Sequence, residues 1–139
     1  MEYKKELLRD VYWSFALEQH SKQAAFEAAL LAYHDEISGK KLPFKMNEIV
    51  LPFPEVVIQY LVWEEQEDDD DDDFSEPQIK LIADDKKGFT FGEILYKIHS
   101  SIGEILAEGE SYFFEGLTFA IDDDPDFPGI PVYFLEQGS

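Results

Sequence analysis

The segment FTFGEILYKIHSSIGEIL, residues 89–106, carries the clearest structural pattern in the chain. Thr90 and Glu93 have the spacing of a capping box, and Phe89 precedes them at the position of a hydrophobic staple. We therefore expect an amphipathic helix of about four turns that starts near residue 90 and ends before Gly109. Its apolar stripe, which repeats at spacings of three and four residues, consists of Phe91, Ile94, Leu95, Ile98, Ile102, Ile105 and Leu106.

Strand patterns lie on both sides of this helix. Residues 56–63 form an apolar run between prolines and acids, which predicts a strand buried on both faces. Residues 78–83 alternate with a period close to two and predict its hairpin partner. After the helix, residues 112–121 predict a third strand, and residues 130–135 predict a closing strand in which Pro131 favours an edge position or the start of the strand.

The N-terminal part has the pattern of two helices. Its apolar residues are again spaced by three and four, and no Gly or Pro occurs before Gly39. This predicts helices over residues 3–17 and 21–37, with Ser21 as the N-cap of the second and Gly39 as its stop. The aromatic and β-branched content of residues 11–17 leaves a strand open as the alternative there.

Together these elements predict a single α+β domain over residues 1–139, with the order α-α-β-β-α-β-β. Two hairpins separated by a helix favour an antiparallel sheet of about four strands, with the helices packed on one face. Residues 39–54 contain Gly39 and three prolines and are expected to form an irregular connector.

Composition narrows the classes of function. The chain has 31 acidic and 11 basic residues, a formal net charge of −20, and 15% aromatic residues, so it is acidic yet rich enough in aromatics to fold. Such a field repels nucleic acid and anionic membranes and attracts basic protein surfaces. There are no cysteines, no signal segment and no long apolar run, which favours a cytoplasmic protein with no membrane contact.

The acids are concentrated in two segments. From Glu64 to Asp73, nine of ten residues are acidic, and we expect residues 64–76 to form a mobile, solvated loop between two strands. A second cluster spans residues 122–126. Neither fits a calcium-binding EF-hand loop, because the sixth position holds Asp73 or Phe127 in place of glycine. We predict no metal site and no cofactor, although the sequence leaves open whether the aspartate run is ordered or binds a cation.

Catalytic patterns are weak. The histidines lack metal-ligand spacing, the serines lack a nucleophile motif, and we expect His99 to be a surface histidine beside the apolar stripe. The strand segment Tyr112-Phe113-Phe114-Glu115-Gly116-Leu117 is aromatic, and alternation would leave one aromatic face for a partner unless the strand is covered on both sides. Gly116 marks a bulge or a close backbone approach. Glu115 is the one acid inside an apolar strand, and a solvent-facing role is the commoner one for such a residue.

The chain resembles the immunity proteins of bacterial polymorphic toxin systems, which are small, acidic α+β proteins without cysteine. The resemblance rests on the expected helix over residues 91–106, the strand 112–117 and the closing Pro131-Val132-Tyr133-Phe134-Leu135. The resemblance covers residues 89–139. It implies a cytoplasmic, non-enzymatic inhibitor that binds a basic partner such as a toxin nuclease. Acidic loops would attract that partner and aromatics would anchor it. The candidate contact residues are Asp68, Asp70, Asp72, Phe74, Asp122, Asp124, Asp126, Phe127 and Tyr133.

Two other functions remain open from the sequence. The chain could be a structural or regulatory domain that self-associates through its apolar strands, for instance as a homodimer, with the acids serving solubility alone. Alternatively, it could be a small hydrolase that works through carboxylates around Glu115.

Overall fold

The computed structural model describes residues 5–64, 73–107, 113–122 and 124–138, and it confirms a mixed α+β fold. A six-stranded sheet has the order β1-β9-β10-β4-β7, with β2 also paired to β9. Two further pairs, β3 with β8 and β5 with β6, form separate two-stranded sheets. In chain order the elements are β1 (Glu6–Leu7), β2 (Trp13–Ser14), α1 (Gln23–Ser38), β3 (Ile49–Leu51), β4 (Glu55–Gln59), β5 (Val62–Glu64), β6 (Asp73–Ser75), β7 (Gln78–Ile82), β8 (Phe89–Thr90), α2 (Phe91–Ala107), β9 (Phe113–Ile121) and β10 (Val132–Gly138).

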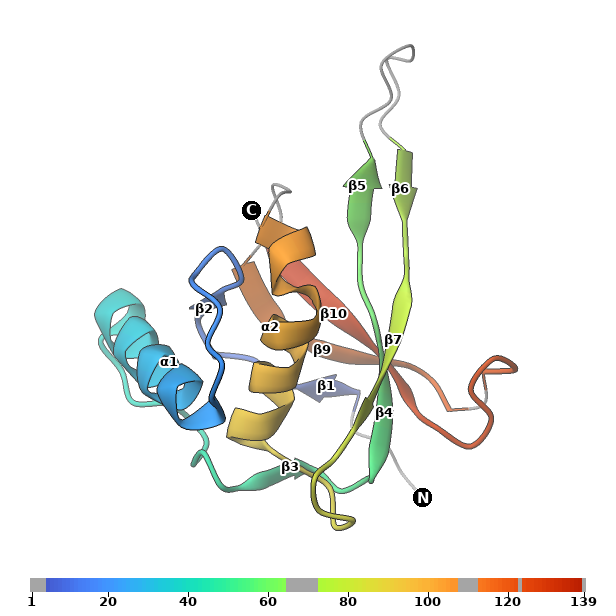
Figure 1. Cartoon of the computed structure of the whole chain (residues 1–139), viewed down its shortest axis with the longest axis horizontal. Helices are drawn as coiled ribbons and strands as arrows, with labels where there is room; N and C mark the ends of the chain where they lie inside the picture. The colour runs from blue at the N-terminus through green and yellow to red at the C-terminus, as the bar shows by residue number, and fades with distance from the viewer. Residues whose placement is uncertain (1–4, 65–72, 108–112, 123, 139) are drawn as a thin grey trace.

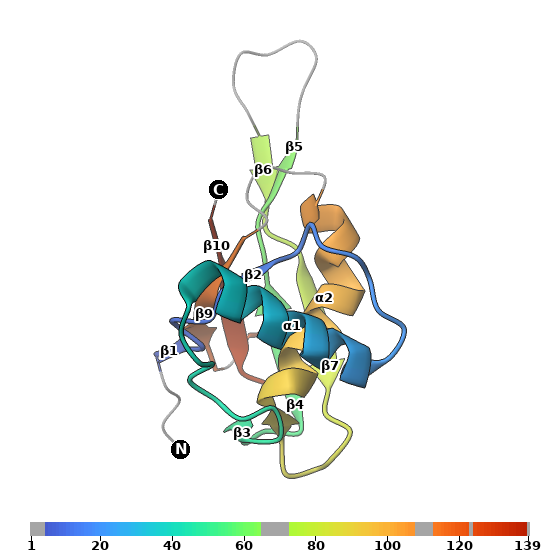
Figure 2. The same cartoon turned by 90° about the vertical axis from the view of Figure 1, so that its left-hand side faces the viewer.

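Both helices lie on the same side of the main sheet, as predicted (Figure 1). α2 lies next to the sheet, and α1 lies outside α2 and contacts both α2 and β2 (Figures 1 and 2). The buried hydrophobic side chains form one cluster, to which Ile58 of β4, Leu95 and Ile98 of α2 and Leu117 of β9 contribute. Full burial of each such side chain contributes about 1.5–3 kcal/mol.

The predicted helix α2 is confirmed, and its start follows from the sequence. The backbone N–H of Glu93 donates to Thr90 Oγ1 at 3.2 Å, which is one half of the capping box. The other half is missing, because the Glu93 carboxylate accepts the N–H of Asp84 at 2.7 Å and pairs with Lys97 at 2.9 Å. Glu93 therefore ties the first turn of α2 to the turn that follows β7.

The predicted helix over residues 3–17 is wrong. The short strands β1 and β2 lie there, and between them Leu8 and Asp10 adopt left-handed backbone conformations with φ of 58° and 68°. A residue with positive φ ends a right-handed helix, and Leu7 instead pairs with Leu117 of β9. The strand alternative for residues 11–17 is correct over Trp13–Ser14.

Helix α1 confirms the second N-terminal prediction except for its cap. Lys22, not Ser21, is at the N-cap, and it makes no side-chain capping hydrogen bond. At the other end Gly39 is left-handed with φ 68°, and its N–H donates to the carbonyl of Asp35 at 2.8 Å.

The sheet differs from the prediction in strand number and in one pairing. β10 runs antiparallel to β9 but parallel to β4, with Val132 opposite Val57. The predicted sheet was antiparallel with about four strands, and the two-residue strands were too short to carry a strand period. Pro131 precedes β10 and its carbonyl accepts the N–H of Val57 at 3.0 Å, so it marks the start of a central strand and not an edge.

The strand predicted over residues 56–63 is divided into β4 and β5. Val56, Val57 and Ile58 are all fully buried, which confirms burial on both faces of β4. Beyond β4, the N–H of Leu61 donates to the side chain of Gln137 at 2.8 Å. β5 then pairs with β6 in a separate hairpin.

Both alternatives for Gly116 are correct. Its φ is +123°, and a β-carbon there would lie 3.0 Å from the carbonyl oxygen of Leu7. The register with β10 shifts at the same point, where Glu136 faces Gly116 and Gln137 faces Phe114. Glu115 is therefore the extra residue of a β-bulge.

Candidate protein-binding site

The two ends of the first acidic segment, Glu64 and Asp73, belong to an arm made of β5 and β6, which projects from the body of the protein (Figures 1 and 2). Trp63 pairs with Phe74 along this arm, so the predicted loop over 64–76 is partly strand. The candidate residues Asp68, Asp70 and Asp72, and the predicted mobility of the loop tip, lie outside the described residues.

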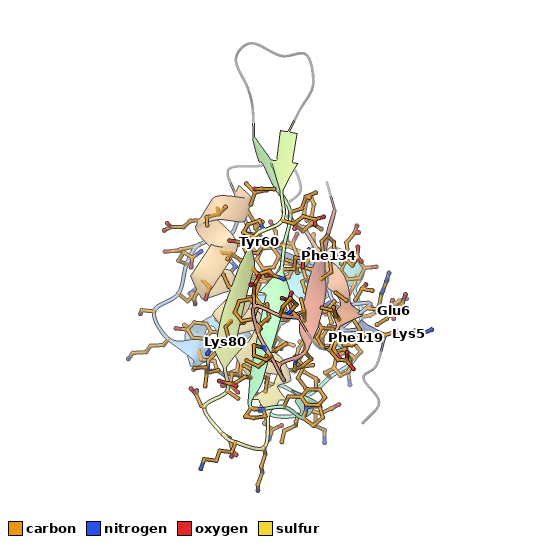
Figure 3. The ribbon with its side chains drawn as sticks, turned by 90° about the vertical axis from the view of Figure 1, so that its right-hand side faces the viewer. Lys5, Glu6, Tyr60, Lys80, Phe119 and Phe134 are labelled. Carbon is orange, nitrogen blue, oxygen red and sulfur yellow. The ribbon has the colours of Figure 1, made fainter. Side chains whose placement is uncertain are left out.

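The second acidic segment belongs to the connection between β9 and β10, residues 122–131. This connection projects on the side of the sheet opposite the helices, which we call the outer face (Figure 1). Asp122 and Asp126 are exposed, as an electrostatic contact requires, while Phe127 is half-buried. Figure 3 looks onto the outer face, from which Lys80 and Phe134 project.

Asp124 differs from its acidic neighbours because it holds the connection in place. Its Oδ1 accepts the backbone N–H of Asp126 at 2.9 Å, and its carbonyl accepts that of Phe127 at 2.9 Å. Its Oδ2 accepts the side-chain amide of Gln78 on β7 at 3.1 Å. Asp124 therefore fixes where Asp122 and Asp126 lie relative to the sheet.

A row of hydrogen-bonded side chains connects the base of the arm to the β9–β10 connection. Gln59 of β4 faces Gln78 of β7, and the amide of Gln78 donates to the amide oxygen of Gln59 at 3.1 Å. Gln59 in turn donates to Glu76, at the base of the arm, at 3.0 Å. With the bond from Gln78 to Asp124, the row runs from the arm to the β9–β10 connection. Sequence reasoning missed both glutamines, because neither has a local pattern that marks it.

One candidate anchor is misplaced. Tyr133 is 1% exposed and belongs to the hydrophobic core, with its ring 5.6 Å from that of Phe119. Tyr133 and Leu135 are buried while Phe134 between them is half-buried, and this alternation places Tyr133 on the core side of β10. A partner could reach Tyr133 only by opening the core, so we remove it from the candidate surface.

The prediction that His99 lies on the surface is also wrong, because its side chain is fully buried. Its Nδ1 accepts the indole N–H of Trp13 at 3.1 Å, so the proton of the neutral ring is on Nε2. Nε2 has no partner with hydrogen-bonding geometry. Burial lowers the pKa of His99, and so does His20, whereas the nearby backbone of Glu18 and Leu17 opposes the shift. These features describe a core histidine that is kept neutral.

The aromatic strand segment lines a pocket. Phe114 is buried and Phe113 is half-buried, and both border a cavity of about 600 Å³ together with Tyr12 and Glu115. Asp10 is the second acid of this pocket. Both carboxylates belong to exposed residues, and this arrangement supports no particular hydrolytic mechanism.

Within the described residues, no group of three or more His, Cys, Asp or Glu side chains could hold a metal ion. In the same residues, no helix is long and apolar enough to cross a membrane. Comparisons with protein-family models, with curated proteins and with solved structures found no match to this chain.

Proposed function

We propose that this protein is an acidic binding module that occupies the basic surface of a protein partner. The observation that carries the proposal is the net charge of −20, together with the dense acidic runs at residues 64–73 and 122–126. A toxin nuclease, whose nucleic-acid groove is cationic, is the kind of partner that this surface suits, and inhibition by occlusion would follow, as in an immunity protein. We also infer a cytoplasmic location, which the resemblance to immunity proteins implies.

The placement of the acids supports this proposal. The arm and the β9–β10 connection are joined by the row of glutamines, so both can face one partner. Asp122 and Asp126 are exposed and Asp124 holds their connection to β7, which reduces the ordering cost of binding. Charges of this kind raise the association rate at low salt by one or more orders of magnitude, so the partner's affinity should depend on ionic strength.

The test captures partners from a lysate of the native host on the immobilised protein, at low and at moderate salt. Three variants are compared with the unchanged chain: Asp68–Asp73 replaced by asparagine, Asp122→Asn with Asp126→Asn, and a control with Glu36→Gln and Glu104→Gln. The control removes the same two charges as the second variant, from exposed positions on the helices. We expect a basic protein to be captured, with an association rate about tenfold lower for the first variant, lower also for the second variant, and little changed for the control that is charge-matched to the second.

Recovery of no basic protein at either salt concentration would refute the proposal. Equal weakening by the control would show that only total charge matters. Light scattering on the same samples tests self-association, which would require a stable homodimer in the absence of any charge-dependent partner.

A further inference from the structure

A second surface of different chemistry lies on the helix side of the molecule. Residues 28, 31, 32 and 35 occupy one face of α1 over two turns, and the segment 40–47 runs alongside them (Figure 2). Between them is an open groove of about 840 Å³, which we call the α1 groove. Its lining is mainly apolar, with one carboxylate, that of Asp35, and one amide, that of Asn47. The apolar lining residues are Ala28, Leu31, Ala32, Leu42, Phe44 and Met46.

The α1 groove is built on fixed elements. Phe44 packs against Phe91 at the start of α2, with ring centroids 5.3 Å apart. The carbonyl oxygen of Met46 accepts the N–H of Gly92 at 3.0 Å, and that of Glu48 accepts the N–H of Phe91 at 2.8 Å. The segment 40–47 is thus attached to the N-terminal end of α2, and the groove is preformed.

The floor of the groove exposes apolar surface. Leu31 is 53% exposed although it lies in the middle of α1. On the same helix face Ala28 and Ala32 have short side chains, which let another backbone approach α1 closely. A contiguous apolar groove with polar edges is typical of a protein-interaction site.

Three exposed lysines line this groove, and we call them the rim lysines. In a chain with 31 acids and 11 bases, lysines are expected to find carboxylate partners. Within the described part of the chain the ion pairs are made by other basic residues, and the rim lysines make none there. The rim lysines are Lys40, Lys41 and Lys45.

We propose that the α1 groove binds an acidic amphipathic helix of a protein partner. The apolar floor matches the apolar face of such a helix, and the rim lysines match acidic side chains on its flanks. A small molecule suits the groove less well, because ligand sites enclose most of their ligand, whereas this groove is open and its floor residue Leu31 is half exposed.

This proposal does not depend on the proposed function. Helix α1, which lines the groove, lies on the helix side of the sheet, and the β9–β10 connection lies on the outer face (Figure 1). The groove attracts acids, whereas the outer face attracts bases. The two surfaces can therefore be occupied together, and either proposal can fail while the other holds.

The probe is a synthetic helical peptide of leucine and glutamate, about four turns long, with leucines at i, i+3, i+4 and i+7. Binding is followed by backbone amide shifts of the full-length, isotope-labelled protein. A peptide with lysine in place of glutamate serves as the comparison. We expect saturable shifts over residues 28–46 with the glutamate peptide, even though the net charge of −20 opposes its approach.

Two protein variants identify the site. Replacing the rim lysines by glutamine should weaken the glutamate peptide at least tenfold and should not weaken the lysine peptide. The charge-matched control replaces Lys22, Lys86 and Lys87, which are exposed elsewhere, and should weaken the glutamate peptide less than twofold. Leu31→Ala should weaken binding of the glutamate peptide and reduce the amide shifts over residues 28–46. The protein should remain folded, because Leu31 is half exposed. Absence of saturable shifts over 28–46, or equal weakening by the control, would overturn the proposal.

Discussion

Mild acid should destabilise this protein through His99. The imidazole is fully buried and accepts the indole N–H of Trp13, so a second proton on the ring would face that donor in a site without water contact. Desolvation lowers the pKa of His99 in the folded state. In the unfolded chain the same ring takes up a proton near its ordinary pKa of 6.5. The stabilisation is therefore complete above that value and is lost as the pH falls below it.

The size of the effect follows from one proton. If the folded-state ring stays neutral throughout, the free energy of unfolding falls by about 1.4 kcal/mol between about pH 7.5 and about pH 5.5. Urea unfolding followed by circular dichroism across this range measures the change. The matched variant is His99→Asn, whose amide oxygen can accept from Trp13 but does not titrate. Self-repulsion among the 31 acids changes with pH in both proteins, so it cancels in the difference.

We expect the stability of the unchanged protein, relative to His99→Asn, to decrease on acidification. His20→Asn, at a half-buried position, should leave most of that pH dependence in place. A difference between the unchanged protein and His99→Asn that stays constant over the range, or that favours the unchanged protein at low pH, would refute the reasoning.

Two further predictions concern the free energy of unfolding, measured from the denaturant midpoint, with the dependence of that free energy on denaturant concentration unchanged between variants. Gly88→Ala should cost at least about 3 kcal/mol, because φ is +134° and the new β-carbon would lie 2.1 Å from a backbone carbonyl oxygen. Gly129→Ala, with φ +79° and open space, should cost only about 1–2 kcal/mol, and an equal cost for both would contradict the argument. Glu93→Gln should cost about 1–3 kcal/mol, because this 4% exposed carboxylate binds a backbone N–H at 2.7 Å and Lys97 at 2.9 Å. Glu104→Gln, exposed on the same helix, should be near neutral.

The sequence predicted those elements whose pattern spans several periods. α2, α1, β4, β7 and β9 each bury a side-chain pattern long enough to identify helix or strand. The segment before α1 also has helical spacing, but it buries its apolar residues without forming a helix. Leu8 and Asp10 take left-handed conformations, and Leu7 joins the sheet. A two-residue strand is too short to show an alternation of apolar and polar residues in the sequence. The six-stranded sheet and its parallel strand pair therefore could not be predicted.

The error on His99 has a specific cause. Periodicity assigns a helix one buried stripe, whereas α2 lies beside the sheet (Figure 1) and also contacts α1 and, through Trp13, β2. The buried arc is therefore wider than the apolar stripe and includes His99, Glu93 and Gly103. Ile105, which the stripe includes, is 44% exposed. A polar residue beside a stripe is thus ambiguous until the neighbours of the helix are known.

The candidate site was predictable only as a list of acids. The sequence located both acidic segments, but it could not separate Asp124, which is held by Gln78, from the exposed Asp122 and Asp126. The contact between Gln59 and Gln78 depends on the register of β4 and β7, across 19 residues of chain. The same limit applies to the rim lysines, because only the fold places them around an apolar groove.

Net charge alone suggests that every part of this protein repels an acidic ligand, and the fold gives a reason to expect otherwise. At physiological ionic strength the Debye length is about 8 Å, so a docked peptide responds mainly to the charges that it contacts. The α1 groove and the acidic connection lie on opposite sides of the sheet (Figure 1). Raising the salt from low to physiological concentration should therefore weaken the basic partner, whose attraction is long-range. The same change should spare or strengthen the acidic helix, because it screens the repulsion from distant acids while the contacts with the rim lysines are partly retained. We therefore expect salt to lower the affinity of the basic partner but not that of the acidic helix, because the charge is concentrated in particular segments of the chain.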